Sequence, residues 1–226
     1  MKNKTKVSVI IPAYNEEMTL SCVVKKVFES LKGECRFEVI VVDDGSLDNT
    51  FKVANNSGAL VIRHNRNMGQ GAALKSGLKL ASGDIVVMLD ADGQHDPAEI
   101  PKLIDPILRN EADLVIGSRY LGGNSGFGPI RELLDKLFLF FIRILTNSKL
   151  TDSQSMFRGI RREVFKNISL HADYTISGEL IIKAKKMGLR ITEVPIHVSR
   201  RIHGRSYVNI YYPIHVIFTM LRSAAE

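Results

Sequence analysis

Two aspartates, Asp90 and Asp92, stand directly after a short apolar run at residues 85–89. The run is continuous, as expected for a parallel strand covered on both faces. Ligands of open α/β sheets bind at the carboxyl ends of the strands, and alternate residues of an extended chain point the same way. Asp90 and Asp92 could therefore face one cation together, and hard oxygen ligands suit Mg²⁺ or Mn²⁺. A solvated acidic turn is the alternative, because Asp and Gly are ordinary turn residues.

The overall charge favours an anionic partner. The chain has 226 residues with 31 Lys+Arg against 24 Asp+Glu, which gives a formal net charge of +7. Phosphates, nucleic acid or an anionic membrane face would match this charge. Cys22 and Cys35 fit no metal-binding spacing and indicate a reducing compartment. No signal peptide opens the chain and no run reaches the ~20 apolar residues that span a bilayer, so we expect a soluble or peripheral protein.

Apolar runs alternate with helical patterns along the first part of the chain. Strands are expected at 7–11, 37–42, 60–62, 85–89 and 114–117, and helices at 20–31, around 53–54, at 72–81 and at 98–108. This alternation predicts a doubly wound α/β domain with a mainly parallel sheet. We expect the strand that ends before Asp44 to lie next to the strand that ends before Asp90, so that both acids reach one crevice.

The pattern changes after residue 121. A loop rich in glycine at 122–129 precedes a heavily apolar helical segment at 132–145. A helix at 177–187, a strand at 191–198, a basic loop and an apolar segment at 210–221 follow. We interpret residues 1–226 as a single domain, with a nucleotide-sugar-binding core at about 1–120 and an acceptor-binding part with amphipathic helices at about 121–226.

An ordered set of motifs runs through the chain. These are VIIPAYNEE (9–17), VVDDGSLDN (41–49), NMGQGAALKSGL (67–78), DADGQHDP (90–97), GSRY (117–120), TDSQSMFRG (151–159) and EVPI (193–196). The set resembles the family 2 glycosyltransferases, and within them the polyprenyl-phosphate hexose synthases such as dolichyl-phosphate mannose synthase. The similarity covers roughly residues 6–206. It implies the GT-A fold, a single Rossmann-like α/β domain with a mainly parallel mixed sheet flanked by helices.

The resemblance implies roles for individual residues. The implied donor-binding residues are Pro12, Tyr14, Glu16, Val42, Asp44, Asp90, Ala91, Asp92, Arg119 and Arg201. The implied catalytic residues are Asp92 and Arg201, the metal ligands Asp90, Asp92 and Gln94, and the acceptor-phosphate ligands Arg131 and Arg205.

Several of these residues also have plainer interpretations. Glu16 could be a first-turn acid of the helix that follows it. Tyr14 could be a packing residue, and Arg119 a solvated surface charge. His95 is expected to be a turn residue, and residues 67–71 a structural turn with a helix start.

Two departures from the family pattern concern the donor and the acceptor. Tyr207 stands where the family's Arg-x-x-Gly-x-Ser-Lys loop has lysine, and we expect Arg205 to supply the missing charge with a different geometry. Met156 stands where the family's Ser-Gly-Phe-Arg motif has glycine. The processive polysaccharide synthases of the wider family carry a Gln-x-x-Arg-Trp motif, and the lack of any Trp in this chain disfavours that branch.

Taken together, the sequence predicts a metal-dependent, inverting transfer of a hexose (mannose or glucose) from GDP-mannose or UDP-glucose to a polyprenyl (dolichyl) phosphate. A phosphate monoester has a second pKa near 6 and is already a dianion at about neutral pH, so no catalytic base is demanded. The alternatives are a glycosyltransferase acting on a protein-bound or soluble glycan, and a nucleotide-sugar-binding regulator without turnover.

The apolar segments at 133–145 and 210–221 favour a membrane surface over nucleic acid as a partner. Each is too short to span a bilayer, and basic neighbours such as Arg131, Lys136, Arg143 and Arg222 could meet anionic headgroups. We therefore expect a cytoplasmic protein attached peripherally to the cytoplasmic face of a membrane, with no nucleic-acid partner. Two buried core helices are the alternative interpretation.

Overall fold

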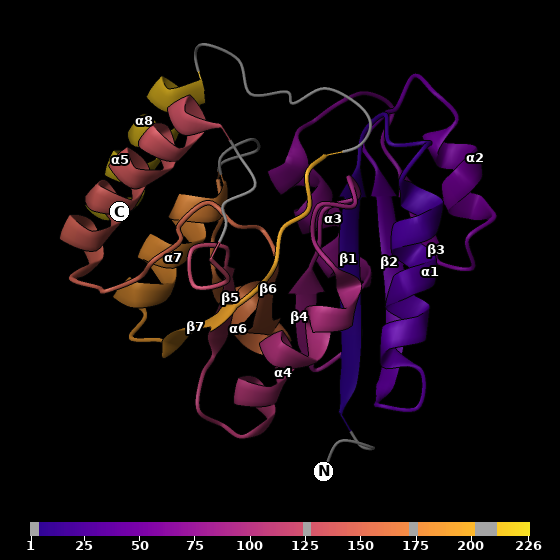
Figure 1. Cartoon of the computed structure of the whole chain (residues 1–226), viewed down its shortest axis with the longest axis horizontal. Coiled ribbons are helices and arrows are strands. Elements are labelled where there is room, and N and C mark those ends of the chain that lie inside the picture. Colours follow the sequence, from indigo (N-terminus) through magenta and orange to yellow (C-terminus); the bar gives the residue numbers. More distant parts are fainter. Residues whose placement is uncertain (1–4, 124–127, 172–175, 202–211) are drawn as a thin grey trace.

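Seven strands form one sheet in the order β3-β2-β1-β4-β6-β5-β7 (Figure 1). The computed structural model describes residues 5–123, 128–171, 176–201 and 212–226. The strands are β1 (Lys6–Ala13), β2 (Arg36–Asp43), β3 (Leu60–Arg63), β4 (Ile85–Met88), β5 (Leu114–Ser118), β6 (Arg158–Arg161) and β7 (Ile191–Pro195).

The first half of the sheet is parallel. β1 pairs with β2 on one side and with β4 on the other, and β2 pairs with β3, all in parallel. β5 and β7 also pair in parallel. The predicted mainly parallel sheet is confirmed. The expected contact between the strands before Asp44 and Asp90 is wrong, because β1 lies between β2 and β4; both acids nevertheless follow the carboxyl ends of parallel strands.

β6 is the strand that the sequence did not predict. It lies between β4 and β5 and runs antiparallel to both, which makes the sheet mixed. Its sequence, RGIR, holds one apolar residue and two arginines, so no apolar run announces it. The side chain of Arg158 is nevertheless fully buried, and it donates hydrogen bonds to the carbonyls of Ser153, Ser155 and Ser177. Backbone carbonyls thus solvate this buried cation.

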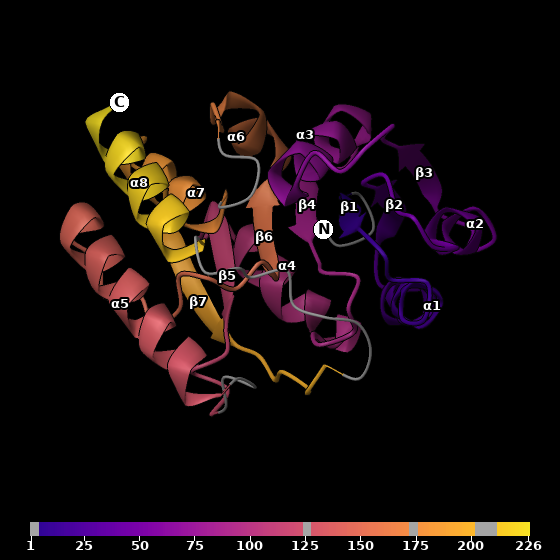
Figure 2. The ribbon, with the colours of Figure 1, turned by 90° about the horizontal axis from the view of Figure 1, so that it is seen from above.

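Helices cover both faces of the sheet (Figure 2). The first face packs against α1 (Leu20–Leu31), α2 (Thr50–Asn55) and α4 (Ile100–Leu108), the last of which follows the short 3₁₀ helix η1 (Pro97–Glu99). The second face packs against α3 (Gln70–Leu80), α5 (Pro129–Thr146), α6 (Arg162–Asn167), α7 (Ile176–Lys186) and α8 (Tyr212–Ala225). Alternate residues of β1 serve the two cores: Val9 and Ile11 face the first, and Ile10 faces the second.

The helices α5 and α8 overlap the apolar segments that we expected at 132–145 and 210–221. α5 and α8 contact one another at the outer side of the sheet's second half, away from α1 and α2 (Figures 1 and 2). Within the part of the chain that the structure describes, no helix is long and apolar enough to cross a membrane.

Candidate active site

Asp90 and Asp92 lie in the turn that follows β4, at the carboxyl edge of the parallel strands. Their side chains are mostly buried, with exposed fractions of 27% and 14%. Burial raises the pKa of Asp90 to about 7, and the negative charge of Asp92 acts in the same direction. Two carboxylates crowded in this way favour a cation between them.

The donor set at this turn fits Mg²⁺ or Mn²⁺. Both metals prefer hard oxygen ligands, and Mg²⁺ keeps several waters while it binds one or two protein carboxylates together with substrate phosphates. Among the described residues, no group of three or more His, Cys, Asp or Glu side chains could hold a metal ion. Asp90 and Asp92 would therefore share the ion with the diphosphate of a substrate. Gln94 is buried and its Nε2 donates to the carbonyl of Ser199 (3.2 Å); its role as a further ligand stays a prediction.

Arg201 reaches this site from a distant part of the chain. Its Nη2 donates to Oε1 of Glu16, and its Nη1 lies 3.7 Å from Oδ2 of Asp92. Glu16 is nine-tenths buried, and burial raises its pKa despite the neighbouring Arg201 charge. Glu16 precedes α1, whose first turn holds no acid, so its interpretation as a first-turn acid is wrong. The structure brings Glu16, Asp92 and Arg201 together; their contact with a donor stays a prediction.

The segment that carries Arg201 is tied to the turn after β4. The N–H of Ser199 donates to the carbonyl of Gln94 (2.8 Å), and an isolated antiparallel bridge joins His95 to Val198. The ring of His95 is buried against Phe157, with 5.3 Å between centroids, and burial lowers its pKa to about 4. The turn after β4 thus positions Arg201 as well as the two aspartates.

The carboxylate of Asp44 holds the loop that precedes α3. Its Oδ1 accepts a hydrogen bond from the N–H of Met68 (3.0 Å) and lies 2.6 Å from Nδ1 of His64. Its Oδ2 accepts from the N–H of Gly69 (2.8 Å). Asp44 is 3% exposed, and in this structure its carboxylate is hydrogen-bonded to the protein's own groups. Its contact with a base and ribose stays a prediction.

Four further donor-site candidates lie around the same edge. Pro12 is the half-buried penultimate residue of β1, and Tyr14, also half-buried, comes directly after the strand. Val42 near the end of β2 is fully buried, and Ala91 between the two aspartates is 3% exposed. Because Val42 has no exposed side chain, a ligand could reach it only through its backbone. Contact between these four residues and a nucleotide stays a prediction.

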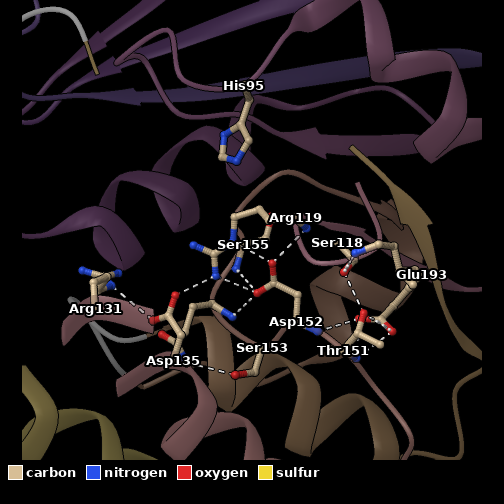
Figure 3. Close-up of polar contacts among 12 residues, drawn as sticks. His95, Ser118, Arg119, Arg131, Asp135, Thr151, Asp152, Ser153, Ser155 and Glu193 are labelled. Atoms are coloured by element: carbon tan, nitrogen blue, oxygen red, sulfur yellow. Dashed lines mark hydrogen bonds and ion pairs between the residues drawn. The ribbon is translucent and has the colours of Figure 1, made fainter. Parts of the chain in front are cut away.

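Arg119 and Arg131 belong to a buried network of charges (Figure 3). Arg119 is 3% exposed, and its Nε and Nη2 donate to the two oxygens of Asp152 (2.6 and 2.8 Å). Nη2 also donates to Asp135 (3.0 Å), whose other oxygen accepts from Nε of Arg131 (3.1 Å). Burial alone would lower the pKa of Arg119. The carboxylates of Asp152 and Asp135 outweigh this effect, so the pKa is raised above its ordinary value. The interpretation of Arg119 as a solvated charge is wrong; its contact with phosphate stays a prediction.

Asp152 is held in turn by Glu193 of β7. Carboxylate oxygens of Glu193 accept hydrogen bonds from the N–H groups of Thr151 (2.8 Å) and Asp152 (2.8 Å), and the hydroxyls of Thr151 and Ser118 are 2.7 Å apart (Figure 3). The network therefore links β7, the loop at 151–155, the end of β5 and α5. Sequence reasoning gave no role to Asp135, Asp152 or Glu193. Arg119 lies 16 positions from Asp135 and 33 from Asp152, and Thr151 lies 42 positions from Glu193.

The rest of the predicted basic loop cannot be placed in this network. Arg205, expected to bind the acceptor phosphate, lies outside the described residues, as do His203, Gly204 and Tyr207. Their roles stay predictions.

Comparison with known proteins gives the class of the protein. The family model described as "Glycosyl transferase family 2" matches residues 8–169. The chain therefore belongs to glycosyltransferase family 2, and it is a glycosyltransferase with the α/β architecture of the GT-A structures. The family resemblance of the motifs is confirmed.

Two individual relatives are similar to this chain over most of its length. The dolichol-phosphate mannosyltransferase of Pyrococcus furiosus is 38% identical over 210 residues, which cover 89% of this chain and 58% of that relative. The UDP-N-acetylglucosamine–dolichyl-phosphate N-acetylglucosaminyltransferase of Methanococcus voltae is 37% identical over 212 residues, which cover 83% of each protein. The chain thus spans less than two thirds of the Pyrococcus relative and most of the Methanococcus relative.

Solved structures show the same fold with ligands. Glucosyl-3-phosphoglycerate synthase of Mycobacterium tuberculosis, in complex with Mn²⁺, UDP-glucose and phosphoglyceric acid, superposes with a TM-score of 0.81 at 28% identity. The match covers 98% of this chain and 80% of that chain. The same enzyme in complex with Mg²⁺ and UDP gives a TM-score of 0.80 at 28% identity, with the same coverage.

Proposed function

We propose that this protein transfers a hexose from a nucleoside diphosphate sugar to a polyprenyl phosphate, with inversion at the transferred carbon. The observation that carries the proposal is the pair Asp90 and Asp92 at the carboxyl edge of the sheet, with Arg201 3.7 Å from Asp92. Anionic diphosphate, divalent cation and guanidinium would complement one another there. The two relatives named for transfer to dolichyl phosphate support the acceptor class.

The residues have distinct parts in this reaction. Asp90 and Asp92 would hold Mg²⁺ or Mn²⁺, which when bound neutralises negative charge on the leaving diphosphate. Arg201 would bind the reacting phosphates. An oxygen of the acceptor phosphate forms the new bond to the sugar carbon as the bond to the diphosphate breaks, from the opposite side. Because a phosphate monoester is already largely a dianion at neutral pH, no side chain has to take a proton.

A direct assay tests the reaction class and the acceptor together. Purified protein is incubated with radiolabelled GDP-mannose or UDP-glucose, dolichyl phosphate and Mn²⁺ or Mg²⁺, and the label is followed into the organic phase. We expect label transfer with one of the two donors and its loss with EDTA. Transfer only to a soluble glycan or protein would support the alternative acceptor. Nucleotide-sugar binding without any transfer would support a regulator instead.

The outer face of α5 and α8 suits a peripheral position on a membrane. Large apolar side chains are exposed along both helices, and α5 repeats them at the spacing of one helical face. They are Ile130 (78%), Leu133 (69%), Leu137 (42%), Phe140 (58%) and Ile144 (62%) in α5, and Ile214 (66%), Phe218 (66%) and Leu221 (52%) in α8. Exposed Lys136 and Arg143 lie on the same helix. We propose that this apolar face enters the interfacial layer of the cytoplasmic leaflet, whose lipids are anionic.

Flotation with vesicles of phosphatidylcholine and phosphatidylserine should show this attachment. We expect the protein to float at low salt and the double variant Phe140→Ser, Ile144→Ser to lose most of its binding. Leu60→Ser removes a similar exposed residue (47%) from β3, at the opposite edge of the sheet, and should bind as the wild type does. Unchanged flotation of the double variant, at equal melting temperature, would contradict the assignment of this face.

A further inference from the structure

Gln70 contacts the candidate metal ligand Asp90 directly. Its Nε2 donates a hydrogen bond to Oδ1 of Asp90 at 2.6 Å. Gln70 is the first residue of α3, and it lies in a motif whose expected role was a structural turn and a helix start. A carboxylate held at one oxygen loses freedom of rotation, so this contact bears on how Asp90 presents its remaining lone pairs.

The position of Gln70 is itself fixed from the preceding loop. The two residues before it, Met68 and Gly69, donate their N–H groups to the buried carboxylate of Asp44. Gly69 has φ of +93°, a backbone conformation that a residue with a side chain rarely adopts. The loop therefore places Gln70 next to Asp90. Through this loop, Asp44 after β2 is connected to Asp90 after β4.

Close packing of α3 on the sheet also restricts the position of Gln70, which begins this helix. Gly77 faces β1, and a Cβ at this position would lie 2.5 Å from Cγ2 of Ile10 and 3.3 Å from Cγ2 of Val42. The missing side chain lets α3 approach the sheet, and the tight contact resists sliding of the helix. Gln70 thus stands on a rigid element, which suits a residue that orients another.

The second oxygen of Asp90 has no comparable partner among the described side chains. Nδ1 of His95 lies 3.8 Å from Oδ2, too far for a hydrogen bond, and this buried nitrogen makes no hydrogen bond in the described structure. Among the described side chains, Gln70 is therefore the one that donates a hydrogen bond to Asp90.

We propose that Gln70 is a positioning residue for the divalent cation: its amide holds Oδ1 of Asp90, so that the carboxylate is oriented before the ion arrives. This inference rests on the proposed metal site. Outer-shell partners of ligating carboxylates typically change metal affinity or activity by about 10–100-fold when they are removed. A metal site with only two protein carboxylates depends strongly on the orientation of each.

The variant Gln70→Met tests this proposal, because methionine keeps the length of the side chain and its helix propensity while it removes the amide. Lys79→Met is the matched control, since Lys79 is exposed in the last turn of the same helix. Free Mn²⁺ is measured by electron paramagnetic resonance during titration of each protein, first with Mn²⁺ alone and then with UDP or GDP present. Melting temperature is recorded for all three proteins.

We expect Gln70→Met to raise the Kd for Mn²⁺ alone by about 10-fold or more, while Lys79→Met stays at the wild-type value. With nucleotide present, the Michaelis constant for Mn²⁺ in the transfer assay should rise more than turnover falls. An unchanged Kd for Mn²⁺ in a folded Gln70→Met protein would overturn the proposal. A change seen only with nucleotide present would also overturn it, because Gln70 would then act on the nucleotide.

The same titration separates this proposal from the proposed function. Wild-type protein that binds Mn²⁺ tightly enough to be affected by Gln70→Met, but transfers no sugar, would overturn the reaction and keep the positioning role. Wild-type protein that binds no Mn²⁺, even with nucleotide, would overturn the metal site and the role of Gln70 together.

Discussion

The Asp92→Asn variant should lose sugar transfer by about 10³-fold or more while it keeps its fold. A divalent metal supplies several kcal/mol of stabilisation to charge that develops in a transition state, and this depends on anionic ligands. The substitution removes one of the two carboxylates. Asparagine keeps the shape of the side chain, and its oxygen can still accept the hydrogen bond that Oδ1 of Asp92 accepts from the N–H of Gln94 (3.0 Å). The loss therefore concerns charge rather than structure.

Three measurements on the same protein check this prediction: transfer with radiolabelled donor, nucleotide affinity with and without Mn²⁺, and the melting temperature. We expect Mn²⁺ plus UDP or GDP to raise the melting temperature of the wild type and not that of Asp92→Asn. Asp96→Asn is a matched control, because Asp96 is exposed and caps η1 through an oxygen that asparagine retains. Full activity in Asp92→Asn would contradict the metal role of this turn.

The parallel part of the fold was predictable because its strands are buried on both faces. β1, β2, β4 and β5 each read as a continuous apolar or β-branched run, and the helices between them show apolar periodicity. Their order in the sheet was less predictable. The sequence placed two acids at strand ends but could not show that β1 separates the two strands.

β6 escaped prediction for a physical reason. A strand is recognised in sequence by side chains that suit burial, and RGIR offers mainly arginine and glycine. Burial of Arg158 depends on three carbonyls from outside the strand, and Gly159 is required because a Cβ there would lie 2.8 Å from the carbonyl oxygen of Leu103. Both features arise only when the rest of the fold is present.

The candidate site, like the fold, was predictable only in part. Asp90, Asp92 and Glu16 were identified because they stand at strand ends or in family motifs. The partners that orient such residues were missed, because side chains that act on one another lie far apart in the chain. Asp152 holds Arg119 across 33 positions and Gln70 holds Asp90 across 20. No local pattern predicts such pairs.

The Arg201→Ala variant should lose about 10²-fold or more in turnover, which is the scale for removal of one group that stabilises developing charge. The structure gives this prediction a basis that the sequence lacked. The guanidinium of Arg201 lies between Glu16 and Asp92, with 21% of its side chain exposed. A residue of a solvated basic face would point into water. Instead, Arg201 faces the carboxylates where metal and diphosphate are expected to bind.

Stability should change much less than turnover in this variant. Loss of Arg201 leaves Glu16 without its cation, but the pKa of Glu16 is already raised by burial, so this carboxyl can take up a proton instead of remaining a buried charge. Thr19 still donates a hydrogen bond to its Oε2 (3.0 Å). We therefore expect a melting temperature within a few degrees of the wild type, on the scale of a surface substitution.

Arg200→Ala is the control that decides between a specific phosphate contact and general positive charge. It removes the same charge one position earlier, from an exposed side chain. General attraction of an anionic donor or acceptor predicts similar, salt-dependent losses in both variants. A phosphate contact predicts a large loss in Arg201→Ala that 0.5 M salt does not reproduce in the wild type, and little loss in Arg200→Ala. If Arg201→Ala keeps near-wild-type turnover with dolichyl phosphate, Arg201 does not bind the reacting phosphates, and the acceptor assignment loses its main support among the described residues.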